Sequence, residues 1–189
     1  MGQVYLNRIA TAVPGHDIHA KFVDYAARHM KSERDRNMFT RIAGKLQIDH
    51  RYSVLNNSND PQRLDGDDFY IRGNSPDTGR RMEFYKRHAF SLAQQALDKL
   101  QFNPAEITHL IITSCTGFYA PGIDLEIIRH YNIAPSVERN FIGFMGCYAA
   151  INALKMAAHI VRSDEAAQVL ILNLELCTLH LQETTEMET

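Results

Sequence analysis

The sequence lacks the features that would place it in or across a membrane. None of its apolar runs approaches the roughly 18 residues that a membrane-spanning helix requires. The first residues, Met-Gly-Gln-Val-Tyr-Leu-Asn-Arg, contain no charged lead followed by a long apolar core, so they do not form a signal peptide. Leu6 stands where an N-myristoylation pattern needs Ser or Thr. We therefore expect no membrane span and no export signal.

An excess of one charge and paired cysteines are also missing. The 20 Lys and Arg residues nearly balance the 22 Asp and Glu residues, the net charge is -2, and the basic residues are dispersed. This distribution does not favour nucleic acid or another polyanion as a partner. The three cysteines, at positions 115, 147 and 177, are an odd number and match no zinc-binding spacing. We therefore expect reduced thiols, no metal site and a cytoplasmic location.

Helical and strand patterns alternate along a chain of ordinary globular composition. It has 189 residues, 45% hydrophobic and 22% charged, which suits one domain or slightly more. The sequence predicts strands over residues 4–13, 109–113, 137–142 and 169–174, helices over 20–29, 34–45, 81–100, 124–131 and 147–162, and a long polar loop over 56–78. This alternation predicts an α/β fold with a largely buried sheet.

The last two of these elements carry specific expectations. In the helix over 147–162, Ile151, Leu154, Ala158 and Val161 share one face, which we expect to pack on the core. The apolar run over 169–174 is typical of a fully buried strand, and no capping helix follows it before Thr189. Because a buried strand near a terminus usually needs a further layer, we expect a longer fold or a covering partner.

One cysteine is a candidate covalent catalyst. In Asn-Phe-Ile-Gly-Phe-Met-Gly-Cys-Tyr-Ala-Ala, over 140–150, an apolar run leads through a glycine to Cys147, and a helix-forming segment follows. The thiol is expected at the first turn of a helix, where unpaired N–H groups and the helix dipole favour a thiolate. A thiolate is the nucleophilic form of cysteine, so Cys147 is a candidate acyl carrier. The alternative is a buried structural cysteine.

Three ordered motifs together resemble one known family. The segment Thr-His-Leu-Ile-Ile-Thr-Ser-Cys-Thr-Gly-Phe-Tyr-Ala-Pro-Gly, over 108–122, is similar to the strand-to-loop segment of the type III polyketide synthases, the chalcone synthase-like enzymes. Residues 143–150, Gly-Phe-Met-Gly-Cys-Tyr-Ala-Ala, resemble their nucleophile motif, and residues 169–180 resemble the strand and cavity-lining turn that follow it. Residues 36–52 resemble the family's early helix and turn. The likeness is greater to the bacterial branch than to plant enzymes.

The resemblance implies a thiolase-like fold, of which residues 1–189 represent the first half only. That fold has two similar α/β halves in αβαβα layers, usually in a homodimer. Cys147 corresponds to the catalytic cysteine, which takes an acyl group from coenzyme A and is extended with decarboxylated malonyl units from malonyl-CoA. No metal or redox cofactor is implied. The family's catalytic histidine and asparagine belong to the second half, so we do not expect this chain alone to carry out condensation.

The resemblance also assigns residues to the substrate cavity. Cys115 and Thr116 follow one strand, and Cys177 and His180 follow another; all four would shape the cavity around the growing chain. Plain loop packing is the alternative for the first pair. Glu175 follows the last strand, and we assign no hydrogen-bond donors to its carboxylate.

Two further pairs of residues are assigned more distant roles. Arg41 and Lys45, one helical turn apart, would hold coenzyme A phosphates, although a further basic position used in plant members is Met38 here. A solvated basic helix face is the alternative. Ala120 and Pro121 would lie on the loop that passes a residue to the neighbouring subunit, and the bond before Pro121 can be cis.

Two other functions compete with a polyketide synthase. A ketoacyl-carrier-protein synthase III shares the fold and the nucleophile, although the segments over 116–122 and 175–177 favour the polyketide branch. A non-catalytic half, acting as a structural or regulatory partner of a full-length synthase, belongs to a different class.

Overall fold

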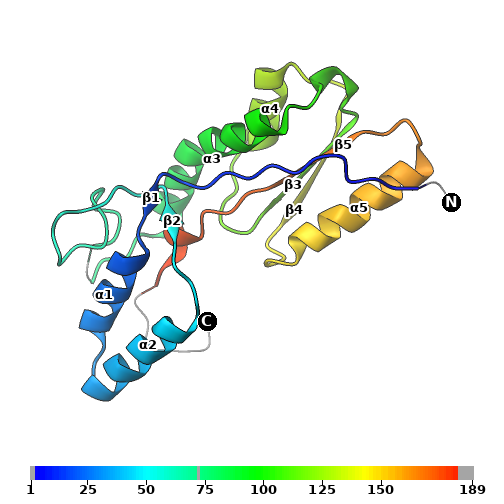
Figure 1. Cartoon of the computed structure of the whole chain (residues 1–189). Coiled ribbons are helices and arrows are strands. Elements are labelled where there is room, and N and C mark those ends of the chain that lie inside the picture. The colour runs from blue at the N-terminus through cyan, green and yellow to red at the C-terminus, as the bar shows by residue number, and fades with distance from the viewer. Residues whose placement is uncertain (1–2, 72, 183–189) are drawn as a thin grey trace. The chain divides into compact units, whose positions relative to one another are not determined.

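The computed structural model describes residues 3–71 and 73–182, and the chain divides into two compact units (Figure 1). The first unit combines residues 3–12 with 79–180, and the second combines residues 13–78 with 181–182. The candidate nucleophile Cys147 therefore belongs to the first unit, whereas Arg41 and Lys45 belong to the second.

A parallel three-stranded sheet forms the centre of the first unit. Strand β3 (His109–Ser114) lies between β4 (Glu138–Gly143) and β5 (Val169–Asn173). All six residues of β3 are buried, as expected for a central strand rich in Ile and Leu. The register pairs Ser114 with Gly143 and Thr113 with Asn173, so the three strands end at the same edge of the sheet (Figure 1).

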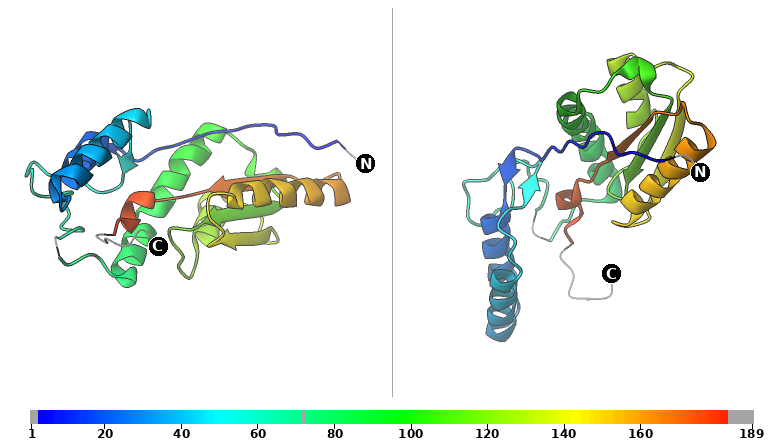
Figure 2. Two further views of the ribbon diagram at one scale, coloured as in Figure 1. Left: turned by 90° about the horizontal axis from the view of Figure 1, so that it is seen from below. Right: turned by 45° about the vertical axis from the view of Figure 1, so that its right-hand side comes forward.

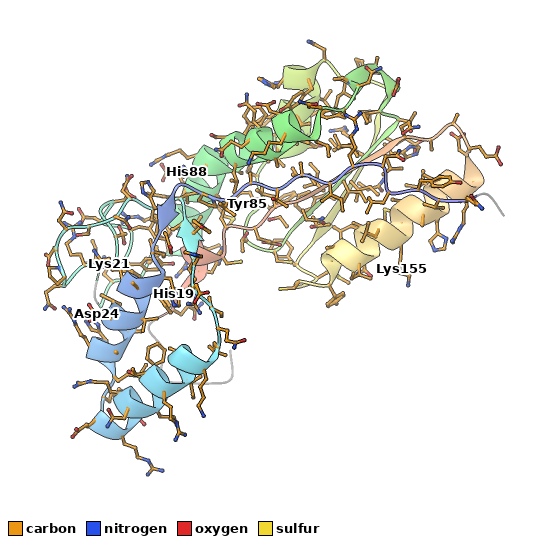
Figure 3. The ribbon with its side chains drawn as sticks, in the orientation of Figure 1. His19, Lys21, Asp24, Tyr85, His88 and Lys155 are labelled. Carbon is orange, nitrogen blue, oxygen red and sulfur yellow. The ribbon has the colours of Figure 1, made fainter. Side chains whose placement is uncertain are left out.

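Helices cover both faces of this sheet, which confirms the predicted α/β fold (Figure 2). Helix α5 (Ala149–Ser163) packs on one face, where Ala153 and Ala157 form a core cluster with Ile111. Helices α3 (Thr78–Leu100) and α4 (Ile123–Tyr131) lie on the opposite face. There the hydroxyl of Tyr85, labelled in Figure 3, donates a hydrogen bond of 2.9 Å to Ser114 Oγ.

Local sequence signals set several helix ends. Asn132 adopts the left-handed conformation, with a φ of 54°, and closes α4, a position that asparagine tolerates better than most residues. The short 3-10 helix η1 (Pro104–Glu106) starts after Asn103, whose side chain accepts the Ala105 N–H at 3.2 Å. None of the helices within residues 3–71 and 73–182 combines the length and the apolar character needed to cross a bilayer.

The second unit contains two helices, a short sheet and a long loop. Helices α1 (His19–His29) and α2 (Glu33–Lys45) contact each other, and strand β1 (His16–Asp17) pairs antiparallel with β2 (Tyr52–Ser53). The Asp17 carboxylate joins the two strands: it contacts His50 Nδ1 at 2.6 Å and accepts the backbone N–H groups of His19 and Arg51. These bonds, that of His50 first, lower the pKa of Asp17 to about 2, and the same contact raises the pKa of His50.

The long polar loop has a small core of its own. Over residues 54–71 and 73–77 it contains one isolated bridge and no helix, as the sequence predicts. However, Asp65 is only 3% exposed, and its carboxylate accepts the backbone N–H groups of Asp67, Phe69 and Tyr70 at 2.9 Å each. Phe69 is fully buried. A buried carboxylate with three donors fixes the loop locally.

The predicted N-terminal strand is wrong. Residues 4–13 form no strand, and Leu6 and Ile9 are exposed. Instead, the Arg8 guanidinium donates to the carbonyl groups of Leu100 and Gln101. β-propensity measures how well side chains fit a half-buried pleated surface, and no neighbouring strand among the described residues offers this segment such a surface.

The prediction of a fully buried last strand is also wrong. In β5, Leu170 and Leu172 are buried, whereas Val169 and Ile171 are only partly buried and Asn173 is exposed. The strand is an edge of the described sheet, and one of its faces is covered less completely than the other. An apolar run therefore predicts full burial correctly for the central strand β3 but not for the edge strand β5.

Helix α5 presents the opposite face from the one expected. Its buried residues are Ala149, Ala153 and Ala157, while Ile151 is 58% exposed and Leu154 is 44% exposed. Both faces of this helix are apolar, so periodicity alone does not decide which one meets the sheet. The alanine face allows the helix backbone to approach β3 closely, and this leaves the larger side chains outside.

Candidate active site

Three loops meet at the carboxyl edge of the sheet, and each contains one cysteine. Cys115 directly follows β3, Cys147 lies in the turn between β4 and α5, and Cys177 begins the 3-10 helix η2 (Cys177–His180) after β5. All three thiols are free. Because the carboxyl ends of parallel strands commonly carry the binding sites of α/β proteins, this edge is the candidate active site.

The nucleophile candidate lies in a tight turn immediately before α5. Gly146 has a φ of 75°, which glycine adopts without strain. Phe144 also has a positive φ, 57°, and such a conformation costs a residue with a side chain about 1 kcal/mol or more. The Cys147 side chain is exposed, which contradicts the alternative of a buried structural cysteine.

The helix begins two residues later than predicted. Tyr148 is the N-cap and Ala149 the first helical residue, so Cys147 precedes α5 rather than lying in its first turn. The first turn contains no acidic residue, and the Tyr148 side chain makes no capping hydrogen bond. The N–H groups of Ala149 and Ile151 donate to the Gly146 and Tyr148 carbonyl groups at 3.0 and 2.9 Å, so the start of α5 favours negative charge nearby mainly through the helix dipole.

The loop after β3 contacts the nucleophile turn directly. Cys115 Sγ accepts the Gly146 N–H at 3.1 Å and lies 3.7 Å from the Gly146 carbonyl oxygen. One strand position earlier, the Phe144 N–H donates to the Ser114 carbonyl at 3.3 Å. The fold therefore brings Cys115 to the backbone of the residue that precedes Cys147.

Glu175 joins the loops after β3 and β5 through hydrogen bonds whose donors no sequence motif indicates. It is exposed, and its carboxylate accepts the Cys115 N–H at 2.8 Å and the Thr116 hydroxyl at 2.6 Å. The Thr116 hydroxyl oxygen accepts the Leu176 N–H at 2.8 Å, and the Thr116 carbonyl accepts His180 Nε2–H at 2.8 Å. The only signal was position: Glu175 follows a strand that pairs with the one before Cys115.

The environment of Cys177 differs from that of Cys147. Burial is the largest cause that raises the pKa of the Cys177 thiol, and negative charge on Glu175, Cys147 and Cys115 acts in the same direction. A raised pKa leaves less thiolate at neutral pH. Both side chains are exposed, so the raised pKa makes Cys177 the poorer nucleophile through its smaller thiolate fraction and not through lack of access.

The other predicted site residues lie on other elements of the chain. Ala120 and Pro121 are exposed in the loop that leads to α4, and a cis peptide bond joins them. Arg41 and Lys45 are exposed on α2, four residues apart and therefore on one face of that helix. In the part of the chain that the structure describes, no group of three His, Cys, Asp or Glu side chains is arranged to hold a metal ion.

Comparisons with known sequences agree with this arrangement. The model of the chalcone and stilbene synthases, N-terminal domain, matches residues 1–188. The chain is 39% identical over 104 residues to the alpha-pyrone synthesis polyketide synthase-like protein Pks18 of Mycobacterium tuberculosis, which covers 53% of this chain and 26% of that protein. It is 26% identical over 182 residues to bisdemethoxycurcumin synthase of Oryza sativa subsp. japonica, which covers 91% of this chain and 44% of that protein.

Solved structures share the fold. CsyB complexed with CoA-SH superposes with a TM-score of 0.72 at 26% identity, over 91% of this chain and 46% of that one. The 1,3,6,8-tetrahydroxynaphthalene synthase from Streptomyces coelicolor A3(2) superposes with a TM-score of 0.77 at 24% identity, over 97% of this chain and 51% of that one. The chain spans about half the length, or less, of these relatives. With its thiolase-like α/β fold, it belongs to the chalcone and stilbene synthase family, the type III polyketide synthases, and corresponds to their N-terminal domain.

Proposed function

We propose that Cys147 accepts an acyl group from an acyl-CoA starter, the loading step of a type III polyketide synthase. One observation carries the proposal: an exposed thiol lies at the carboxyl edge of a parallel sheet, directly before a helix without acidic residues in its first turn. The Cys147 thiolate attacks the thioester carbonyl, the bond from that carbonyl to the CoA sulfur breaks, and CoA leaves as a thiolate that takes up a proton. Because one thioester replaces another, the step needs no metal or redox cofactor.

Extension with malonyl-CoA is proposed for a complete synthase rather than for this chain alone. Loss of carbon dioxide from the malonyl group generates an enolate, and the histidine and asparagine that the family uses to stabilise it match no motif of this sequence. Removing one donor of this kind typically costs about 10²–10³ in rate. We therefore expect this chain to be loaded without running condensation, and to regain malonyl-CoA decarboxylation when a family member's C-terminal half is supplied as a second chain.

Intact mass spectrometry tests the loading step. After incubation with acyl-CoAs of several chain lengths, one acyl group per chain is expected, and the same acyl groups on a carrier protein should not transfer. Transfer from the carrier protein alone would instead favour a ketoacyl-carrier-protein synthase III-like enzyme. No transfer from either donor would contradict the proposal.

Arg41 and Lys45 are proposed to bind the phosphates of coenzyme A. Both side chains are exposed on one face of α2, and cation–phosphate contacts are charge-assisted hydrogen bonds. Replacing both with alanine should raise the acyl-CoA concentration for half-maximal loading by about tenfold, with less change in the maximal rate. Arg34→Ala, at another exposed position of α2, is the matched control. An unchanged half-saturation concentration in the double variant would assign these residues to a solvated helix face.

An exposed apolar surface in the first unit supports a covering subunit. It comprises large exposed side chains from the nucleophile turn and the outer face of α5: Phe144, Met145, Tyr148, Ile151 and Leu154. Exposed apolar side chains gathered on one turn and the helix that follows it are typical of protein–protein contacts. We propose that a second copy or a complementary C-terminal half covers it. A non-catalytic partner of an intact synthase would use the same surface.

Charged substitutions on this surface should weaken assembly. Ile151→Glu with Leu154→Glu places two carboxylates where an apolar contact is proposed, and should weaken self-association, or binding to a full-length synthase, by at least tenfold. Sedimentation velocity over a concentration series measures this. Gln95→Glu, exposed on α3 at the opposite face of the sheet, is the control for added negative charge. If the double variant associated as strongly as the wild type, this surface would not be part of the interface.

A further inference from the structure

A chain of polar contacts links Glu175 to the turn that presents Cys147. Glu175 Oε1 accepts the Cys115 N–H at 2.8 Å, and Oε2 accepts the Thr116 hydroxyl at 2.6 Å, so the two carboxylate oxygens hold two adjacent residues of one loop. Cys115 Sγ in turn accepts the Gly146 N–H at 3.1 Å. Gly146 immediately precedes Cys147, so two hydrogen bonds, from Cys115 to Glu175 and from Gly146 to Cys115, connect the carboxylate to the nucleophile turn.

From this chain we infer that Glu175 is a positioning residue for Cys147. By holding the loop of Cys115 and Thr116, it places Cys115 Sγ against the Gly146 N–H and so fixes the turn before α5. The role requires no contact between Glu175 and the substrate. The expected effect on acyl loading rests on the proposed function, whereas the expected effect on the conformation of the turn does not.

A carboxylate suits this position better than other side chains. Two donors, the Cys115 N–H and the Thr116 hydroxyl, point at the same group, and an ionised carboxylate accepts both. A glutamine offers one acceptor oxygen and turns an NH₂ group toward the second donor. The Thr116 hydroxyl oxygen already accepts the Leu176 N–H, and its hydrogen is donated to Glu175, so the contact with Glu175 uses Thr116 as the donor.

The link from Cys115 to Gly146 depends on this support. Sulfur is a weak hydrogen-bond acceptor, so the N–H···S contact does not by itself hold a glycine in the left-handed conformation. The Cys115 backbone must be fixed from the other side, and its N–H is fixed by Glu175. The Glu175 charge also contributes to the raised pKa of Cys177. Removing that charge should therefore lower the pKa of the Cys177 thiol.

Three variants test the inference: Glu175→Ala, Glu175→Gln, and Glu165→Gln as an exposed control in the turn that follows α5. The first measurement is amide hydrogen exchange of residues 143–148. We expect Glu175→Ala to speed exchange of the Gly146 amide by about tenfold, Glu175→Gln to give an intermediate change and Glu165→Gln none. Residues 152–160 of α5 should be unaffected in all three, which shows that the fold is retained.

The second measurement is acyl loading at saturating acyl-CoA. Glu175→Ala should lower the maximal loading rate at least tenfold with little change in half-saturation, because misplacing a nucleophile affects orientation rather than binding. Glu175→Gln should recover part of the rate. Alkylation of Cys177 followed against pH should show a lower pKa in both Glu175 variants, because a neighbouring negative charge is gone.

Each outcome bears on one statement. Unchanged Gly146 exchange in Glu175→Ala overturns the inference even if loading slows, since the turn would then not depend on Glu175. Faster exchange with an unchanged loading rate overturns the positioning role in loading. If the wild type accepts no acyl group from any acyl-CoA, the proposed function fails, while hydrogen exchange still decides whether Glu175 holds the turn.

Discussion

Cys147→Ala should abolish acyl loading, with the mass increase from one acyl group per chain falling to none. The alanine variant keeps the turn, because Gly146 and the start of α5 are unchanged, but it removes the only sulfur at that position. Without the thiolate, no other group in the turn can form the thioester. Intact mass, followed by mapping of the acylated peptide in the wild type, measures the effect.

The two other cysteines make this test selective. Cys177→Ala removes one thiol as well, yet it should still give a single acyl group, mapped to Cys147, because the raised pKa of Cys177 disfavours its thiolate. Acylation that persists in Cys147→Ala, or that maps to Cys115 or Cys177 in the wild type, would assign the nucleophile elsewhere. The same experiment at pH 7 with a thiol-specific reagent reports which sulfur is reachable without any acyl donor.

Gly117→Ala should destabilise the first unit by about 3 kcal/mol or more, an effect at the upper end for overpacking. A Cβ atom at Gly117 would overlap the ring of Tyr85. That ring cannot move aside easily: it is 1% exposed, and its hydroxyl is bonded to Ser114 Oγ. Urea unfolding followed by circular dichroism measures the free energy of unfolding.

Two comparisons separate this overlap from a general cost of replacing glycine. Gly44→Ala, where an added Cβ meets nothing within 4 Å inside helix α2, should be neutral or stabilising by up to about 1 kcal/mol. Gly117→Ala combined with Tyr85→Ala should cost less than the sum of the two single changes, since the cavity accepts the new methyl group. Additive costs would mean that Gly117 and Tyr85 act independently.

The elements that depend on local sequence were predictable. The elements predicted over 109–113, 124–131 and 81–100 correspond to β3, α4 and α3, and each lies within a few residues of its expected bounds. The errors arise where pairing or packing with other elements of the chain decides the structure. Residues 4–13 have strand-forming side chains but no paired neighbour, and α5 has two apolar faces of which the sheet takes the alanine one.

In the candidate site, too, local sequence identifies some residues and not others. Cys147 is recognisable because a glycine and a helix-forming segment flank it directly in the chain. Glu175 is not, because its donors at Cys115 and Thr116 come from a different loop and become neighbours only through the register of β3 and β5. A position whose role depends on strand register leaves no local pattern in one sequence.

That register also determines when the site can form during synthesis. The contacts from Glu175 to Cys115 span 60 residues, and the contact from Cys115 to Gly146 spans 31. Cys147 therefore leaves the ribosome before the strand that carries its support, and contacts between residues so far apart in the sequence slow folding because loop closure must precede them. A nascent chain that ends between Cys147 and Glu175 should contain the nucleophile without the Glu175 hydrogen bonds that hold its turn.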